Sequence, residues 1–138
     1  MKLKIITGIS FLLCLLVYAC QSEGSIEFAR YYTGGAVIYR DHCQNCHSVK
    51  GEGLGALIPP LTDSGYLKKN LTLLPCLLKN GMRANLVINH KPFDGQMPAA
   101  NLTPMEIAQV MTYVNNSFGN KLGVVTVDDA GNALAKCK

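Results

Sequence analysis

The sequence carries little charge and lacks the patterns that mark nucleic-acid-binding or membrane-spanning proteins. Only 16% of the residues are charged, with 13 Lys and Arg against 9 Asp and Glu. The cationic side chains form no stripe and do not alternate with aromatic ones, so the electrostatic footprint of a nucleic-acid-binding protein is missing. The longest apolar run, Ile5 to Tyr18, has about 14 residues, whereas a membrane-spanning helix needs roughly 20. The sequence therefore predicts no nucleic-acid partner and no spanning helix.

The short apolar run has the layout of an export signal. Lys2 and Lys4 precede it as a positive segment, and it ends in LVYAC, which resembles a bacterial lipobox with Cys20 as the lipid acceptor. The sequence predicts removal of residues 1–19 as a lipoprotein signal peptide, and a lipidated tether over residues 20–27. The mature protein would then lie on the periplasmic or cell-surface side of a bacterial membrane, in an oxidising compartment. An ordinary signal peptide, cut nearby, is the alternative.

The mature chain has only one close pair of cysteines. Two of the six cysteines belong to the export signal, and the remaining four are Cys43, Cys46, Cys76 and Cys137. A four-cysteine zinc site would need a second close pair or a histidine pair, but the last two cysteines lie far apart. A thioredoxin-like site would need C-x-x-C at a strand-to-helix turn, and the residues before Cys43 are not typical of a strand. Zinc and dithiol chemistry are both disfavoured.

The segment CQNCH matches the pattern for covalent haem attachment. Its two cysteines lie about one helical turn apart, which suits the two vinyl groups on one edge of a porphyrin. His47 follows directly and would point its imidazole at the iron. Haem is attached outside the cytoplasm, so the export signal strengthens this interpretation. We predict one haem c, held by Cys43, Cys46 and His47.

The iron needs a second axial ligand, and the loop FDGQMPA supplies one. Met97 stands in this loop between a glycine and a proline, and an irregular segment fixed at both ends can present a thioether to a buried iron. A neutral sulfur favours ferrous iron and raises the reduction potential relative to a second imidazole. We predict Met97 as the ligand opposite His47. His90 and an open or water-bound position are the alternatives.

The other methionines and histidines have simpler interpretations. Met105 and Met111 belong to a periodic helix, and Met82 follows a helix-stop signal, so it could bind iron only if the chain turned back there. His42 immediately precedes the first cysteine and is expected to face away from the pocket that His47 lines. His90 is expected in a solvated turn.

Helix signals dominate the rest of the chain, so the fold class is predicted to be all-α. Thr103 and Glu106 form a capping box before an apolar stripe that continues to Phe118. No segment alternates as a strand should, apart from a short run at 86–89. The expected helices cover about 26–43, 63–69 from a cap at Asp63 or Ser64, 72–80 from a cap at Thr72, 103–118, and a short tail segment from a cap at Thr126.

Taken together, these segments resemble the class I cytochrome c family. CQNCH, GEGLGALIPPL, FDGQMPA and LTPMEIAQVMTYVNNSFGN stand in the family's order and spacing, over about residues 34–119. The resemblance implies four or five short helices around one covalently bound haem c, with the N- and C-terminal helices of the core crossing. The cytochrome domain would cover residues 28–120, and the flanking segments resemble a lipid-anchored bacterial branch of the family.

The resemblance also assigns packing roles. Gly35 and Tyr39 would lie on one face of the first core helix and meet the last helix, the glycine allowing a close backbone approach. The neighbouring Gly34 has no such explanation. The apolar residues expected to line the haem crevice are Leu54, Leu57, Ile58 and Leu61.

Two further residues are assigned to the haem. The carbonyl of Pro59 would accept the free N–H of His47. Phe93 stands four residues before Met97, where the family often has a tyrosine or tryptophan bound to a propionate; Phe93 can pack on the haem but cannot donate. The propionates would then depend on backbone N–H groups or on cations whose simpler interpretation is solvation: Lys79, Arg83 and Lys91.

Cys76 and Cys137 are left over in an oxidising compartment. We predict that they form a disulfide, which ties the core to a C-terminal extension over residues 121–138. Two free buried thiols or an intermolecular bond are the alternatives.

The resemblance implies a monomeric one-electron carrier and not an enzyme. Its partners would be exported or membrane-bound redox proteins, docked weakly and transiently, and its membrane contact would run through the N-terminal lipid. A haem enzyme or gas sensor with a displaceable methionine, or a fixed subunit of a respiratory complex, are the alternatives.

Overall fold

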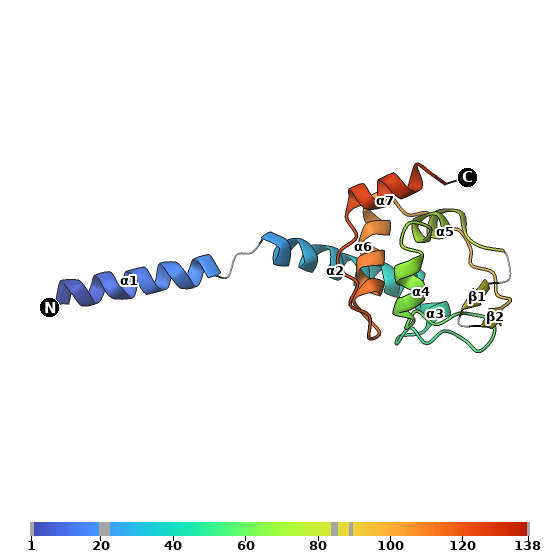
Figure 1. Cartoon of the computed structure of the whole chain (residues 1–138), viewed down its shortest axis with the longest axis horizontal. Helices are drawn as coiled ribbons and strands as arrows, with labels where there is room; N and C mark the ends of the chain where they lie inside the picture. Colours follow the sequence, from blue (N-terminus) through green and yellow to red (C-terminus); the bar gives the residue numbers. More distant parts are fainter. Residues whose placement is uncertain (1, 20–22, 84–85, 89, 138) are drawn as a thin grey trace.

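Seven helices and one small hairpin are found in the computed structural model, which describes residues 2–19, 23–83, 86–88 and 90–137 (Figure 1). The helices are α1 (Lys2–Ala19), α2 (Glu23–His42), α3 (Gln44–His47), α4 (Ser64–Lys69), α5 (Leu74–Asn80), α6 (Pro104–Asn115) and α7 (Val127–Leu134). The two strands are β1 (Leu86–Ile88) and β2 (Lys91–Phe93), paired antiparallel. The predicted all-α class is confirmed.

The predicted export signal forms α1, which lies apart from the other elements in Figure 1. Within the described part of the chain, no helix has both the length and the apolar character needed to cross a membrane. The predicted lipid acceptor, Cys20, lies outside the described residues. Residues 23–27, expected as part of the tether, are helical and form the start of α2. Once α2 is nucleated by its downstream packing, adding residues at its start costs little.

The crossing of α2 and α6 organises the core. A Cβ on Gly35 would overlap the carbonyl oxygen of Gln109, so the glycine lets the two backbones meet, as expected. A Cβ on Gly34 would meet only the side-chain end of Gln109. One turn after Gly35, Tyr39 is 1% exposed, and its ring centroid lies 5.3 Å from that of Tyr113 on α6.

Helix α6 begins where expected and ends early. Thr103 and Glu106 form the predicted capping box. The helix stops at Asn115, however, so Phe118 does not continue the helical stripe; it has a φ of 58° and packs on Tyr39 at 5.2 Å. Asn116 ends the helix because its side chain forms hydrogen bonds with backbone outside the helix. Its Nδ2 donates to Gly123 O, and its Oδ1 accepts from Gly123 N.

The two helices between the glycine-rich loop and the hairpin are α4 and α5. Asp63 caps α4 by accepting a hydrogen bond from Tyr66 N at 3.0 Å, as expected. The expected cap at Thr72 is wrong: α5 starts at Leu74 with no side-chain cap. The preceding residues are used in a turn, in which the N–H groups of Leu73 and Leu74 both donate to Asn70 O.

The C-terminal extension belongs to the core. Val125 and Ala130 are buried in one apolar cluster with Ile107, Ala108 and Met111 of α6. Thr112 Oγ1 and the backbone of Val125 exchange hydrogen bonds, which ties the connection to α6. The structure contains the expected disulfide, Cys76–Cys137, linking α5 to the residues after α7.

The hairpin lies between α5 and the Met97 loop. Its register pairs Leu86 with Phe93 and Ile88 with Lys91. The sequence suggested a strand only for the first half. His90 lies exposed in the connecting turn with a φ of 62°, as expected for a solvated turn residue.

Candidate functional site

The junction of α2 and α3 presents the CQNCH segment. Cys43 caps α3, and its carbonyl accepts hydrogen bonds from the N–H groups of Cys46 and His47 at 3.1 and 2.9 Å. This single turn places both thiols and the imidazole on one short element. Cys43 and Cys46 form no disulfide, and Cys43 is the more buried of the two.

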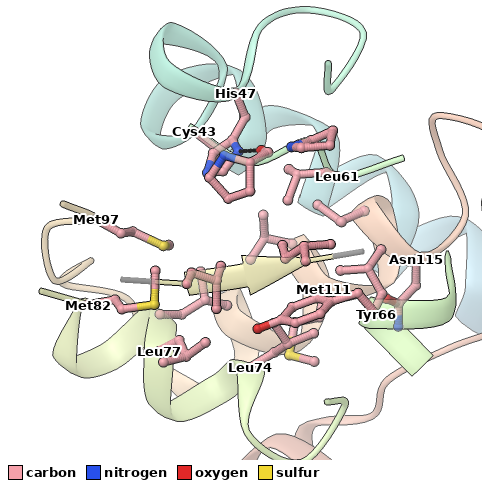
Figure 2. A pocket seen from close by; sticks show the side chains of 18 residues that line it. Cys43, His47, Leu61, Tyr66, Leu74, Leu77, Met82, Met97, Met111 and Asn115 are labelled. Atoms are coloured by element: carbon pink, nitrogen blue, oxygen red, sulfur yellow. Dashed lines mark hydrogen bonds between the residues drawn. The ribbon is translucent and has the colours of Figure 1, made fainter. Parts of the chain in front are cut away.

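The imidazole of His47 is held in one orientation. Its Nδ1 lies 3.1 Å from the carbonyl oxygen of Pro59, drawn as the dashed line in Figure 2. A carbonyl can only accept, so Nδ1 carries the proton and Nε2 is left as a free lone-pair donor. Burial lowers the pKa of His47, and the bond to Pro59 only partly offsets that effect. Burial thus favours the neutral ring, which is the form that binds a metal.

The loop after His47 turns back to place Pro59. Gly53 N donates to His47 O at 3.1 Å, and Leu61 N donates to Gly51 O at 2.7 Å. Gly53 has a φ of 70°, and a Cβ there would overlap Ile58 O, so only glycine fits this return. The loop geometry thus explains why the glycines follow the histidine.

His47 faces an inner cavity with a nearly all-apolar lining. Figure 2 shows His47 on one side of this cavity and Met82 and Met97 across from it. Between them the wall comes from α4, α5, β1 and α6. Its apolar members include Leu61, Leu67, Leu74, Leu77, Leu78, Leu86, Ile88, Val110, Met111 and Val114.

An outer cavity adjoins the inner one. Cys43, His47, Met82 and Met97 line both, so the space between His47 and the methionines belongs to the two cavities together. The outer wall adds Cys46, Leu57, Ile58 and the segment from Gly95 to Asn101. A flat group placed between His47 and Met97 would therefore have an inner part in apolar surroundings and an outer part near the surface.

This arrangement corrects the expectations for two residues, Leu54 and His42. Leu54 lines neither cavity and is 59% exposed. His42 does line the outer cavity, contrary to expectation, because the last turn of α2 reaches its rim. Leu57, Ile58 and Leu61 line one cavity or the other, as expected.

Phe93 is buried but lines neither cavity, so the structure does not bring it to the site as expected. Leu86, its cross-strand partner, does line the inner cavity. The cations Lys79, Arg83 and Lys91 are exposed and line neither cavity, in agreement with simple solvation.

Backbone contacts fix the loop that carries Met97. Met97 N donates to Met82 O at 2.9 Å, and Met82 N donates to Met97 O at 2.7 Å. Asp94 N donates to Ala56 O at 3.2 Å, and a Cβ on Gly95 would overlap Leu57 O. Gly95 thus allows close packing against the opposite loop, and the backbone that carries the thioether is held from both sides.

In the inner cavity, sequence reasoning missed two polar lining residues, Tyr66 and Asn115. Figure 2 shows them together at the end of the inner cavity away from Met82 and Met97. Asn115 is 1% exposed, and its amide nitrogen has no hydrogen-bond partner in the structure. It lies four residues after Met111 on the buried stripe of α6, and this spacing could have revealed it.

The geometry disfavours the other uses of the cysteine pair. Among the described residues, no three His, Cys, Asp or Glu side chains gather as a metal-binding group. Burial, with a smaller contribution from Cys46, raises the pKa of Cys43 to about 11, whereas a redox-active dithiol needs a lowered value. The cysteines, the neutral histidine and the apolar cavity instead fit a haem.

Comparison with known families agrees with this fit. The profile of the Cytochrome c family matches residues 32–117, which include the cysteine pair, His47 and Met97. The chain belongs to the cytochrome c family. The cytochrome accordingly binds one covalently attached haem c, which is the prosthetic group of a haem-based electron carrier. Domains of this family are typically exported. No curated protein sequence matches the chain.

Proposed function

We propose that this cytochrome is a one-electron carrier whose haem iron is bound by His47 and Met97. The observation that carries the proposal is their placement: both line the same two cavities, from opposite sides (Figure 2). Nδ1 of His47 is engaged by Pro59, so Nε2 is the nitrogen available for iron. The thiols of Cys43 and Cys46 would hold the porphyrin covalently.

The haem supplies the redox chemistry, by cycling between ferric and ferrous iron. The chain supplies a neutral nitrogen and a neutral sulfur, and both stay uncharged during the cycle. The apolar wall from α5 and α6 disfavours the additional charge of the ferric state, and with the thioether it favours a raised reduction potential. Nothing in the inner lining has to gain or lose a proton when an electron arrives.

Electrons would pass through the outer cavity. Its wall carries Cys46 and Leu57, both exposed, so this side of the site meets solvent. Donors and acceptors would be exported or membrane-bound redox proteins that dock here through a small, short-lived interface. A lipid on Cys20 would keep the carrier at a membrane surface, with the export signal removed.

The optical spectrum of the purified protein tests the proposal. A low-spin, six-coordinate reduced form that does not react with CO is expected of a carrier. Rapid CO binding would point instead to a haem enzyme or sensor with a displaceable ligand, and would refute the carrier function.

The identity of the sulfur ligand is tested separately. Methionine ligation gives a weak charge-transfer band at the red edge of the oxidised spectrum. Met82→Leu should leave this band unchanged, as should the control Met105→Leu, whose residue is 43% exposed on α6. Loss of the band in Met82→Leu alone would show that Met97 is not the ligand. Mass analysis of wild type and Cys20→Ser tests the lipid.

A further inference from the structure

Met82 lies directly across from Met97 in a two-residue antiparallel bridge. The two residues exchange both backbone hydrogen bonds, at 2.7 and 2.9 Å. Residues directly opposite in an antiparallel pair project their side chains to the same face. Because Met97 faces the cavities, the bridge requires that Met82 face them too. Both methionines line the inner and the outer cavity, and Figure 2 shows both sulfur atoms across from His47.

Gly81 fixes this position of Met82. It ends α5 with a φ of 74°, and its N–H donates to Leu77 O at 2.9 Å. A Cβ on Gly81 would lie 2.6 Å from Met97 O and 2.7 Å from Ala99 N, so the chain passes close against the Met97 loop. The turn that the sequence required for Met82 to reach the iron is therefore present.

The chemistry of Met82 is unused by the proposed carrier. Besides Met82, the residues that line both cavities are Cys43, His47, Pro59, Leu78 and Met97. Leu78 cannot bind a metal, and the other four already have roles at the haem. Among these six residues, Met82 is the one that has a metal-binding atom and no role in the proposed carrier. A thioether is a soft ligand on a flexible side chain, so it can reach iron from a neighbouring backbone position.

We propose that Met82 is a second thioether ligand, which binds the haem iron opposite His47 when the sulfur of Met97 is absent or displaced. This inference rests on the proposed His47–Met97 ligation. Only one sulfur can occupy the position at a time, and the exchange moves a side chain without any redox step. The pair would keep the haem six-coordinate, and closed to small external ligands, after damage to Met97.

The test uses the holoprotein and three variants, Met97→Leu, Met82→Leu and the double variant. Leucine keeps the volume of the side chain and removes the sulfur. We expect Met97→Leu to keep a shifted charge-transfer band and a reduced form that resists CO. The double variant should lose the band, become high-spin and bind CO. Met105→Leu is the matched control, because Met105 is exposed and lines neither cavity.

A second readout follows the sulfur directly. With ¹³C-methyl methionine, the ring current of the reduced haem should strongly shift one methyl resonance in wild type and in Met97→Leu. No methyl should be shifted to this extent in the double variant. Circular dichroism of each variant verifies folding.

The possible failures point to different errors. If Met97→Leu already lacks the band and the shifted methyl, as the double variant does, Met82 is not a second ligand and the proposed function stands. If Met82→Leu alone loses them, Met97 is not the ligand, and both proposals are wrong. A band that survives in the double variant also refutes both, because neither sulfur then binds the iron.

Discussion

The crossing of α2 and α6 provides a matched pair of substitutions, Gly34→Ala and Gly35→Ala. Both glycines lie inside α2, so each change should gain about 1 kcal/mol in helix propensity. They differ in what the new methyl group meets. At Gly34 it would contact the side-chain end of Gln109 at 2.8 Å, which can move aside. At Gly35 it would overlap the carbonyl of Gln109 and lie 2.8 Å from Tyr113 Cβ.

The backbone clash decides the sign at Gly35. Relieving it requires α6 to move away from α2, and overpacking of this kind costs about 3 kcal/mol at the upper end of its usual range. After the propensity gain, Gly35→Ala should destabilise the protein by about 2 kcal/mol. Gly34→Ala should range from neutral to about 1 kcal/mol more stable. The melting temperatures of the two variants should then differ by at least about 8 °C.

Guanidinium unfolding of the holoprotein measures this difference. Circular dichroism reports the helices, and haem absorbance reports the cavity wall that Val110, Met111 and Val114 of α6 provide. Equal stabilities for the two alanine variants would refute the argument, because they would show that backbone contact at Gly35 does not limit the helix crossing.

Three other predictions follow from the structure. Replacing Cys76 and Cys137 by serine opens a loop that spans 61 residues, and the chain-entropy model predicts a loss of about 4 kcal/mol in the free energy of unfolding. A loss below about 1 kcal/mol in guanidinium unfolding would contradict this prediction. The hydrogen bonds from Thr103 lower the pKa of Glu106 from its ordinary 4.5, so the unfolded chain binds this proton first. The contribution of Glu106 to stability should be constant at higher pH and be lost as the pH falls below about 4.5 in guanidinium titrations, and a pH profile identical in wild type and Glu106→Gln would exclude this linkage. The Tyr39 hydroxyl donates to Ser48 O at 2.7 Å, so Tyr39→Phe should reduce the free energy of unfolding by about 1–2 kcal/mol and lower the melting temperature. An unchanged melting temperature would mean that this hydrogen bond does not stabilise the protein.

Local patterns in the sequence predicted much of the site. CQNCH, the capping box at Thr103 and the glycine on the α2 face depend on residues a few positions apart, and the structure places them as expected. The hydrogen bond between His47 and Pro59 was expected from the family resemblance, and the structure contains it.

Errors arose where contacts with neighbouring turns, loops or strands override a local preference. Phe118 continues the apolar periodicity of α6, but Asn116 bonds to Gly123 and ends the helix first. Thr72 is a good cap in isolation, yet the turn at Asn70 uses the residues around it. Phe93 occupies the family's propionate position in sequence, but it is buried in β2 and lines neither cavity.

The sequence by itself determined the cofactor and indicated the histidine that we propose as one axial ligand, because haem attachment needs two cysteines and a histidine within one helical turn. The tertiary structure alone decided which side chains lie across the cavity from His47. Met82 and Met97 are brought together by a backbone bridge, and a hydrogen-bonded pair between separate loops leaves no periodic trace along the chain. For the same reason Asn115, whose buried amide nitrogen has no partner, became part of the cavity wall only when α4, α5 and α6 packed around it.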